Sequence, residues 1–224
     1  MFVATRPDRS SDFGDVLPFD DANSPGTEAT PFLADSGLTL LLASDRFAST
    51  PGHNDLVIAT RTAPSDPFSS PALLANVNSS GIELAPQLST DGLRLYFSSD
   101  RSNNDRDIYM ASRASRADDF DTPARVAGLA GSSQEFGPTL SGDELEVFIA
   151  SDRPGGAGSM DIWRAVRSQL GDPFEQPVNV SEVNGNGYDT DPRLSADGTE
   201  LFFSSSRDGN QVLWVATRTC TQTR

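Results

Sequence analysis

Short apolar segments separated by polar turns follow one another along the whole chain, and one of these segments occurs four times. It reads LTLLLAS at 38–44, LRLYFSS at 93–99, LEVFIAS at 145–151 and TELFFSS at 199–205. Apolar side chains on both faces are typical of a strand that is buried on both sides. No segment of the sequence has the length or the 3.6-residue period of a helix. The pattern therefore predicts an all-β protein made of short strands.

Each apolar segment follows a proline, a short leucine-containing strand and a tight turn. The prolines are separated by 55, 52 and 54 residues and are Pro31, Pro86, Pro138 and Pro192. Asp-Gly in the turn is a strong hairpin signal. The third turn has Glu144 in place of glycine, which predicts strain or another turn type. The second residue after each proline is a leucine that we expect to fill the seam between neighbouring repeats: Leu33, Leu88, Leu140 and Leu194.

Two further strands complete each repeat, and we name the four strands A, B, C and D in chain order. Strand C reads DLVIATR, DIYMASR, DIWRAVR and VLWVATR, and strand D reads ALLANV, ARVAGL and PVNVSEV. A period of about 53 residues without a helix predicts one four-stranded antiparallel sheet per repeat, hence a β-propeller. We assign residues 1–224 to one propeller domain, with strands C and D of a closing blade at 1–30 and blades at 31–85, 86–137, 138–191 and 192–224.

The two ends of the chain leave the number of blades open between four and five. MFVATR at the start matches strand C and DVLPFDD matches strand D, whereas the fourth blade has no strand D of its own. In one interpretation, the N-terminal strand D at about 16–21 completes the fourth blade and the N-terminal strand C is surplus. In the other, the chain is part of a larger propeller and completes itself by strand exchange with a second copy, which predicts a homodimer.

The repeat resembles the WD-repeat-like β-propeller repeat of the TolB periplasmic protein and of many secreted bacterial proteins. The matching segments are PQLSTDG, LYFSSDR and DIYMASR within 86–113, and PRLSADG and LFFSSSR within 192–207. The fourth blade departs from the pattern, because Ser206 and Val212 stand where the other blades have aspartate. The resemblance implies a periplasmic or secreted location and a central channel lined by the A strands. It also implies that the D-to-A and B-to-C connections share one face. It does not specify a function, since propellers host many.

An acidic residue lies three positions before each proline, and the four are Glu28, Glu83, Glu135 and Asp189. Closure of the ring predicts that these carboxylates surround one axis, where like charges raise one another's pKa and a cation would relieve the repulsion. Oxygen ligands without a Cys or His cluster favour Ca²⁺, followed by Mg²⁺ or Mn²⁺. The alternative is that each acid caps backbone N–H groups within its own turn.

Three residues on the same expected face are candidates for auxiliary chemistry. His53, the only histidine, lies in the loop FASTPGHNDL and is interpreted either as a general base or as a solvent-exposed side chain. Asp100 and Asp152 belong to Asp-Arg pairs that end strand B, as does Asp45. They either assist catalysis or hold the rim of the blade through turn hydrogen bonds and ion pairs.

Two functions are consistent with these residues. The first is metal-dependent hydrolysis of activated esters, lactones or phosphotriesters, in which a bound ion activates water. A metal is needed for this chemistry because the sequence has no Gly-x-Ser-x-Gly elbow and no Cys–His pair. The second is a non-catalytic TolB-like module that presents one face to a protein or a glycan.

The composition limits the classes of molecule that the protein is expected to bind. The formal net charge of −15 disfavours nucleic acid and anionic membranes. The single cysteine, Cys220, predicts neither an intrachain disulfide nor a zinc cluster. No apolar run approaches the length of a membrane span, and the N-terminus has no apolar stretch typical of a signal peptide. The remaining partners are a small ester-type substrate, a protein, a glycan or a second copy of the chain.

Overall fold

The computed structural model describes residues 1–8, 10–48, 52–102 and 105–219. They form an all-β fold of four antiparallel sheets arranged as a four-bladed β-propeller, with a small additional sheet at the N-terminus. Cys220 lies outside the described residues, as do three residues of the loop that contains His53. No helix in the described part of the chain is long and apolar enough to cross a membrane.

The first three repeats each form the predicted four-stranded sheet, and the fourth forms three strands. Blade 1 contains β3 (Glu28–Ala34), β4 (Thr39–Ser44), β5 (Asp55–Thr60) and β6 (Ala72–Leu73), with the 3₁₀ turn η1 (Asp35–Gly37) after β3. Blade 2 contains β7 (Glu83–Leu88), β8 (Arg94–Ser99), β9 (Asp107–Ser112) and β10 (Ala124–Arg125). Blade 3 contains β11 (Glu135–Leu140), β12 (Glu146–Ser151), β13 (Asp161–Val166) and β14 (Val178–Asn179). Blade 4 contains β15 (Asp189–Leu194), β16 (Glu200–Ser205) and β17 (Val212–Thr217).

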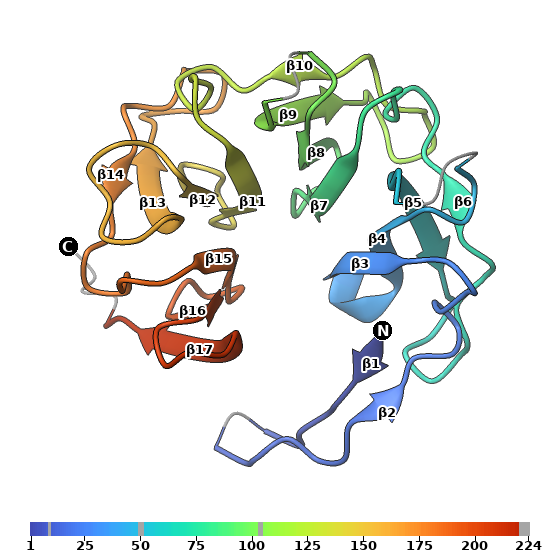
Figure 1. Ribbon diagram of the computed structural model, residues 1–224. Helices are drawn as coiled ribbons and strands as arrows, with labels where there is room; N and C mark the ends of the chain where they lie inside the picture. The colour runs from blue at the N-terminus through green and yellow to red at the C-terminus, as the bar shows by residue number, and fades with distance from the viewer. Residues whose placement is uncertain (9, 49–51, 103–104, 220–224) are drawn as a thin grey trace.

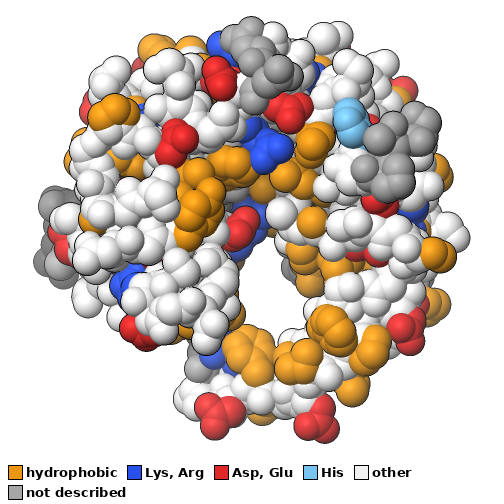
Figure 2. Space-filling view, in the orientation of Figure 1, with side chains coloured by type: hydrophobic (Ala, Val, Ile, Leu, Met, Phe, Trp, Pro, Cys, Tyr) orange, Lys and Arg blue, Asp and Glu red, His pale blue; other side chains and the backbone are white. Residues whose placement is uncertain are grey.

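The blades stand in chain order around a central opening, with the A strands β3, β7, β11 and β15 innermost (Figure 1). The same opening is visible in the space-filling view, where hydrophobic side chains follow the part of its rim formed by β1 and β2 (Figure 2). Successive A strands contact one another, as do the B and A strands of neighbouring blades. Equivalent turns of all four blades are therefore brought to the same end of the opening.

Strand A begins earlier than the sequence predicted. Each acid is its first residue, and the proline lies inside the strand rather than before it. The register shifts just before the proline, and the residue at the shift has a positive φ: Thr30, Ala85, Gly137 and Asp191. A bulge at this point accommodates a residue that has no N–H to donate to the ladder. The acids thus belong to the sheets and not to the loops in which they were predicted.

Apolar side chains of adjacent blades form the seams. Leu88 lies in the seam between blades 1 and 2, Leu140 in that between blades 2 and 3, and Leu194 in that between blades 3 and 4, as the sequence predicted. Leu33 differs, because 53% of its surface is exposed. The small sheet that precedes blade 1 has only two strands, β1 (Phe2–Val3) and β2 (Leu17–Pro18), and neither occupies the position of a strand A or B.

The small N-terminal sheet is the outer half of a blade. Phe2 pairs with Pro18 and Val3 with Leu17. Strands C and D of blade 1 pair in the same way 55 residues later, Val57 with Leu73 and Ile58 with Ala72. This half-blade packs against the outer core of blade 1 through Met1 and Phe19. The N-terminal strand D therefore pairs with its own strand C and does not complete blade 4, whose sheet ends at β17.

Candidate functional site

The four predicted acids occupy equivalent positions, each at the first residue of strand A of its blade. Glu83 illustrates the arrangement: its Oε1 accepts hydrogen bonds from the hydroxyls of Ser79 at 2.6 Å and Ser99 at 2.8 Å. It also lies 3.1 Å from Nη2 of Arg101, which ends the neighbouring strand. The other pairs are Glu28 with Arg46 at 2.9 Å, Glu135 with Arg153 at 3.0 Å and Asp189 with Arg207 at 2.8 Å.

These contacts do not fit a metal ligand set. Each carboxylate already has a guanidinium as counter-ion, and three of the four acids are completely buried. Among the described residues, no group of three or more Asp, Glu, His or Cys side chains lies close enough to hold a metal ion. The structure therefore does not assemble the four acids into one site, and an axial Ca²⁺ stays a prediction from the sequence.

One acid differs from its equivalents in its second oxygen. The backbone N–H four residues before the acid donates to this oxygen in Glu28, Glu83 and Asp189, from Ser24, Ser79 and Gly185. Before Glu135 the matching residue is Gly131, which also lacks the hydroxyl that Ser79 donates to Oε1 of Glu83. Oε2 of Glu135 is buried and accepts no hydrogen bond from a donor in the described residues. Burial raises the pKa of Glu135 to about 8, with Arg153 opposing the rise and the neighbouring Asp107 adding to it. The seam between blades 2 and 3 thus contains a carboxyl that favours its protonated form.

The aspartates of the Asp-Arg pairs hold the turn that leads into strand A. Asp45 accepts a hydrogen bond from the backbone N–H of Thr27 at 2.6 Å, Asp100 from Ile82 at 2.7 Å and Asp152 from Gln134 at 2.8 Å. In blade 4 the hydroxyl of Ser206 accepts the same bond from Tyr188 at 2.8 Å. Serine can replace aspartate here because the contact requires an acceptor and no charge.

His53 and Asp100 line a small hollow of about 220 Å³ together with Ser80, Gly81, Ile82 and Arg101. The structure therefore brings together two of the three residues considered for auxiliary chemistry, and Asp152 belongs to the next blade. Asp100 is already engaged there, because it also lies 3.5 Å from Arg106. This hollow is below the 300–1,000 Å³ that ligand pockets usually occupy.

A larger hollow of about 770 Å³ lies at the opposite end of the opening, among the A-to-B turns. Each blade contributes the end of strand A and its turn, so that apolar side chains, serine and threonine hydroxyls and two acids share one wall. The lining residues are Phe32, Leu33, Ala34, Asp35, Ser36, Gly37, Gln87, Leu88, Ser89, Thr90, Tyr96, Leu140, Ser141, Gly142, Glu144, Leu194, Ser195 and Ala196. This volume lies within the range of ligand pockets.

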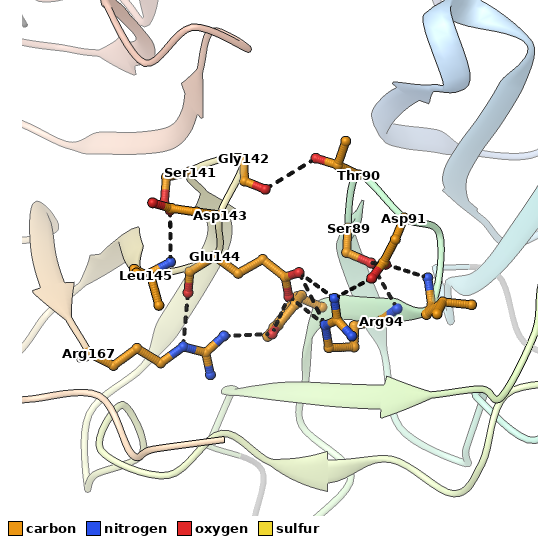
Figure 3. A network of polar contacts seen from close by, with 12 residues as sticks. Ser89, Thr90, Asp91, Arg94, Ser141, Gly142, Asp143, Glu144, Leu145 and Arg167 are labelled. Atoms are coloured by element: carbon orange, nitrogen blue, oxygen red, sulfur yellow. Dashed lines mark hydrogen bonds and ion pairs between the residues drawn. The ribbon is translucent and has the colours of Figure 1, made fainter. Parts of the chain in front are cut away.

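Glu144 gives this wall a feature that the other blades lack (Figure 3). Its φ is 60°, a left-handed conformation that costs a non-glycine residue about 1–3 kcal/mol. Arg94 donates to both of its carboxylate oxygens, at 2.8 Å and 2.7 Å. The hydroxyl of Tyr96 donates at 2.8 Å, and Arg167 binds both the carbonyl of Glu144 and the Tyr96 hydroxyl. The network fixes the strained turn across the seam between blades 2 and 3.

The electrostatics of this network keep two of its groups in one protonation state at neutral pH. Burial, together with the carboxylate of Glu144, raises the pKa of Tyr96 to about 12, so the hydroxyl stays protonated at neutral pH. A hydrogen bond from Ser89, joined by contacts from Leu93 and Arg94, lowers the pKa of Asp91 to about 2. Tyr96 therefore stays neutral and Asp91 stays ionised across the physiological range.

The sequence contained one signal for this network, the glutamate in place of a turn glycine. The prediction of strain at Glu144 is confirmed by its positive φ. Its partners could not be identified, because Arg94 and Tyr96 lie in the preceding repeat and were interpreted only as parts of a buried strand. Contacts across a seam depend on the relative placement of two blades, which the repeat pattern does not specify.

Comparison with solved structures supports the fold. The chain is similar to TolB from Agrobacterium tumefaciens (TM-score 0.53, 20% identity, 87% of this chain and 59% of that one). It is also similar to TolB from Acinetobacter baumannii (0.51, 15%, 90% and 46%). An endo-arabinase from Bacteroides thetaiotaomicron gives a TM-score of 0.63 at 14% identity, over 90% of this chain and 80% of that one.

The extent of these similarities limits what they show. The chain spans about half the length of the TolB structures that it matches. Neither a protein-family model nor a curated protein sequence matches it. At these identities the similarity is to a fold, and a fold does not imply a function. The chain is therefore a β-propeller whose architecture resembles both TolB and glycoside hydrolase structures.

Proposed function

We propose that this chain is a non-catalytic binding module that receives a short segment of a partner protein in the hollow among its A-to-B turns. The observation that carries the proposal is the hollow of about 770 Å³ to which all four blades contribute. Its wall includes the strained Glu144, held by contacts from two blades. Strain maintained by surrounding contacts is common where proteins bind ligands.

The lining favours a peptide over a sugar. The aliphatic side chains of Leu33, Leu88, Leu140 and Leu194 all border the hollow, and hydroxyls and backbone groups lie beside them. This mixture suits an extended peptide that has an apolar side chain and hydrogen-bonding amides. A sugar usually requires an exposed aromatic face. Two aromatic residues line the hollow: Tyr96 is only 2% exposed, and Phe32 is partly buried against the core between blades 1 and 2.

The charge of the molecule limits the partner further. With a net charge of −15, the propeller repels acidic segments and attracts neutral or basic ones. Asp35, which lines the hollow, forms an ion pair with Arg116 at 2.6 Å, and Glu144 forms one with Arg94. The negative charges that line the hollow are therefore paired with positive ones. We therefore expect a neutral or basic segment with at least one apolar anchor. Metal-dependent ester hydrolysis stays a prediction from the sequence, with no contact that favours it.

Selection from a displayed peptide library tests the proposal. Peptides enriched on the wild-type protein are measured against Leu33→Glu, which places a charge on the apolar lining. We expect Kd to increase at least about tenfold, because a carboxylate buried against an apolar anchor has no partner. Leu170→Glu is the matched control, since Leu170 is exposed to a similar extent, 50% against 53%, and does not line the hollow.

The outcomes separate the alternatives. Peptides that lose affinity for Leu33→Glu and keep it for Leu170→Glu support the proposal. Enriched peptides that bind both variants as well as the wild type place the binding surface elsewhere. If no peptide is enriched and a glycan array instead yields ligands sensitive to Leu33→Glu, the hollow binds sugars and the peptide proposal is wrong.

A further inference from the structure

Two apolar surfaces remain uncovered at the ends of the row of blades. On blade 4, Leu213 and Val215 of β17 are 73% and 52% exposed. On the N-terminal half-blade, Phe2 and Phe13 are 71% and 54% exposed. Exposed aromatic and aliphatic side chains of this size that gather on one surface mark interaction sites. We name them the C-terminal face and the N-terminal face.

A complete seam shows what each face normally contacts. Between blades 1 and 2, Leu56 and Ile58 of strand C in blade 1 pack in the same cluster as Tyr109 and Phe120 of blade 2. Arg113 lies over the ring of Phe120, at 4.5 Å from its centroid. The leading blade thus supplies aliphatic residues of strand C, and the following blade supplies one aromatic from strand C and one from the segment before strand D.

The C-terminal face is the leading half of such a seam. β17 pairs with β16 in the register that joins β5 to β4, so that Leu213 matches Leu56 and Val215 matches Ile58. Their neighbour Trp214 points the other way, into the seam with blade 3. Leu213 and Val215 therefore present the aliphatic pair to a following blade.

The N-terminal face is the following half of the seam. Phe2 lies at the strand C position of Val57 in blade 1 and of Tyr109 in blade 2, as the shared registers show. Phe13 lies at the position of Phe120, and Arg6 stacks over its ring at 4.8 Å as Arg113 stacks over Phe120. This face therefore presents the two aromatics that normally receive the aliphatic pair.

The two faces are not joined within one molecule. β1 and β2 form a sheet separate from β15–β17. The half-blade packs instead on blade 1, and none of the hydrophobic clusters among the described residues contains both ends. Both complementary halves of a seam are thus exposed in this structure.

We propose that the C-terminal face of one copy docks on the N-terminal face of a second copy. A two-fold axis would make both contacts at once, so that a closed pair buries all four faces. A second copy is the occupant favoured by the structure, because the N-terminal half-blade carries the aromatic pair that Leu213 and Val215 lack. This pairing joins folded faces and leaves β2 on β1, unlike the strand exchange that the sequence suggested.

Light scattering after size-exclusion chromatography tests the pairing over a range of concentrations. We expect concentration-dependent association to a mass twice the 23.9 kDa of the chain. Leu213→Glu and Phe2→Lys should each raise the dissociation constant by about tenfold or more, since each buries an unpaired charge at the contact. Both positions are exposed in the single molecule, so circular dichroism should show both variants folded.

A mixture of the two variants provides the sharpest readout. In a mixed pair, one contact joins Glu at 213 to Lys at 2 and the other joins the unchanged Leu213 to Phe2, so association should return. Leu170→Glu is the control for adding a carboxylate at an exposed leucine away from both faces. A monomer at every concentration, association unaffected by Leu213→Glu, or a mixture that stays monomeric would each overturn the proposal.

Discussion

Replacing Arg101 with alanine is expected to lower the free energy of unfolding by about 3–5 kcal/mol, the usual cost of leaving a buried charge without its partner. Glu83 is completely buried and Arg101 is its counter-ion at 3.1 Å. The same guanidinium donates to Ser99 and to the carbonyl of Val77, and it stacks over the ring of Phe97. Urea denaturation at neutral pH measures the loss.

Arg116→Ala is the matched control, because Arg116 also pairs with a carboxylate, that of Asp35, but is 49% exposed. Exposed pairs of this kind contribute about 1 kcal/mol or less. Adding Glu83→Gln to Arg101→Ala should recover part of the loss, since the double variant no longer buries an unpaired charge. A loss below about 1 kcal/mol for Arg101→Ala would contradict the structural role assigned to the acid–arginine pairs.

Stability should also decline as pH rises, and Gly131→Ser should reduce that decline. Burial in the fold raises the pKa of Glu135 from its ordinary value of 4.5 to about 8, so the folded chain holds an extra proton between these values. Stability from this group is complete below the lower value and is lost as pH rises through the upper one. We expect a loss of several kcal/mol, because each unit of pKa difference corresponds to about 1.4 kcal/mol.

Gly131→Ser adds a hydroxyl donor beside Glu135, because the hydroxyl of Ser79 at the equivalent position donates to Oε1 of Glu83 in blade 2. A Cβ at Gly131 would lie 3.9 Å from the nearest atoms, so serine fits without displacement. The variant should be more stable than the wild type above about pH 8, in urea melts recorded across pH. Ser79→Gly, which creates the same missing donor in blade 2, should make the decline steeper. Parallel curves for wild type and Gly131→Ser would show that the missing hydroxyl at position 131 does not cause the decline.

Most of the fold could be predicted from the sequence because the same pattern of strands and turns occurs in four repeats. Each copy places an apolar strand B between two turns, and only a propeller stacks such sheets around one opening. The exceptions lie where the repeat is incomplete. Leu33 is exposed, whereas Leu88 and Leu140 are buried and Leu194 is partly buried. Among the described residues, no fourth strand pairs with β17. Both features depend on a neighbouring blade and not on the local pattern.

The candidate site was harder to predict. Four acids at one repeat position were recognised, but their partners were not, although each arginine follows its acid by 18 residues. The prediction treated the acids as loop residues free to meet at the axis. A register shift before the proline extends strand A instead, so that each acid faces the end of strand B and is neutralised there. Sequence spacing alone could not reveal a bulge of this kind.

A calcium titration followed by thermal unfolding tests most directly whether an arginine satisfies each of the repeated acids within its own blade. We expect the same melting temperature for the wild-type protein with Ca²⁺ and with a chelator, because each of these acids already contacts an arginine. A melting temperature that rises with Ca²⁺ in the wild type, and no longer rises in Glu83→Gln, would contradict it.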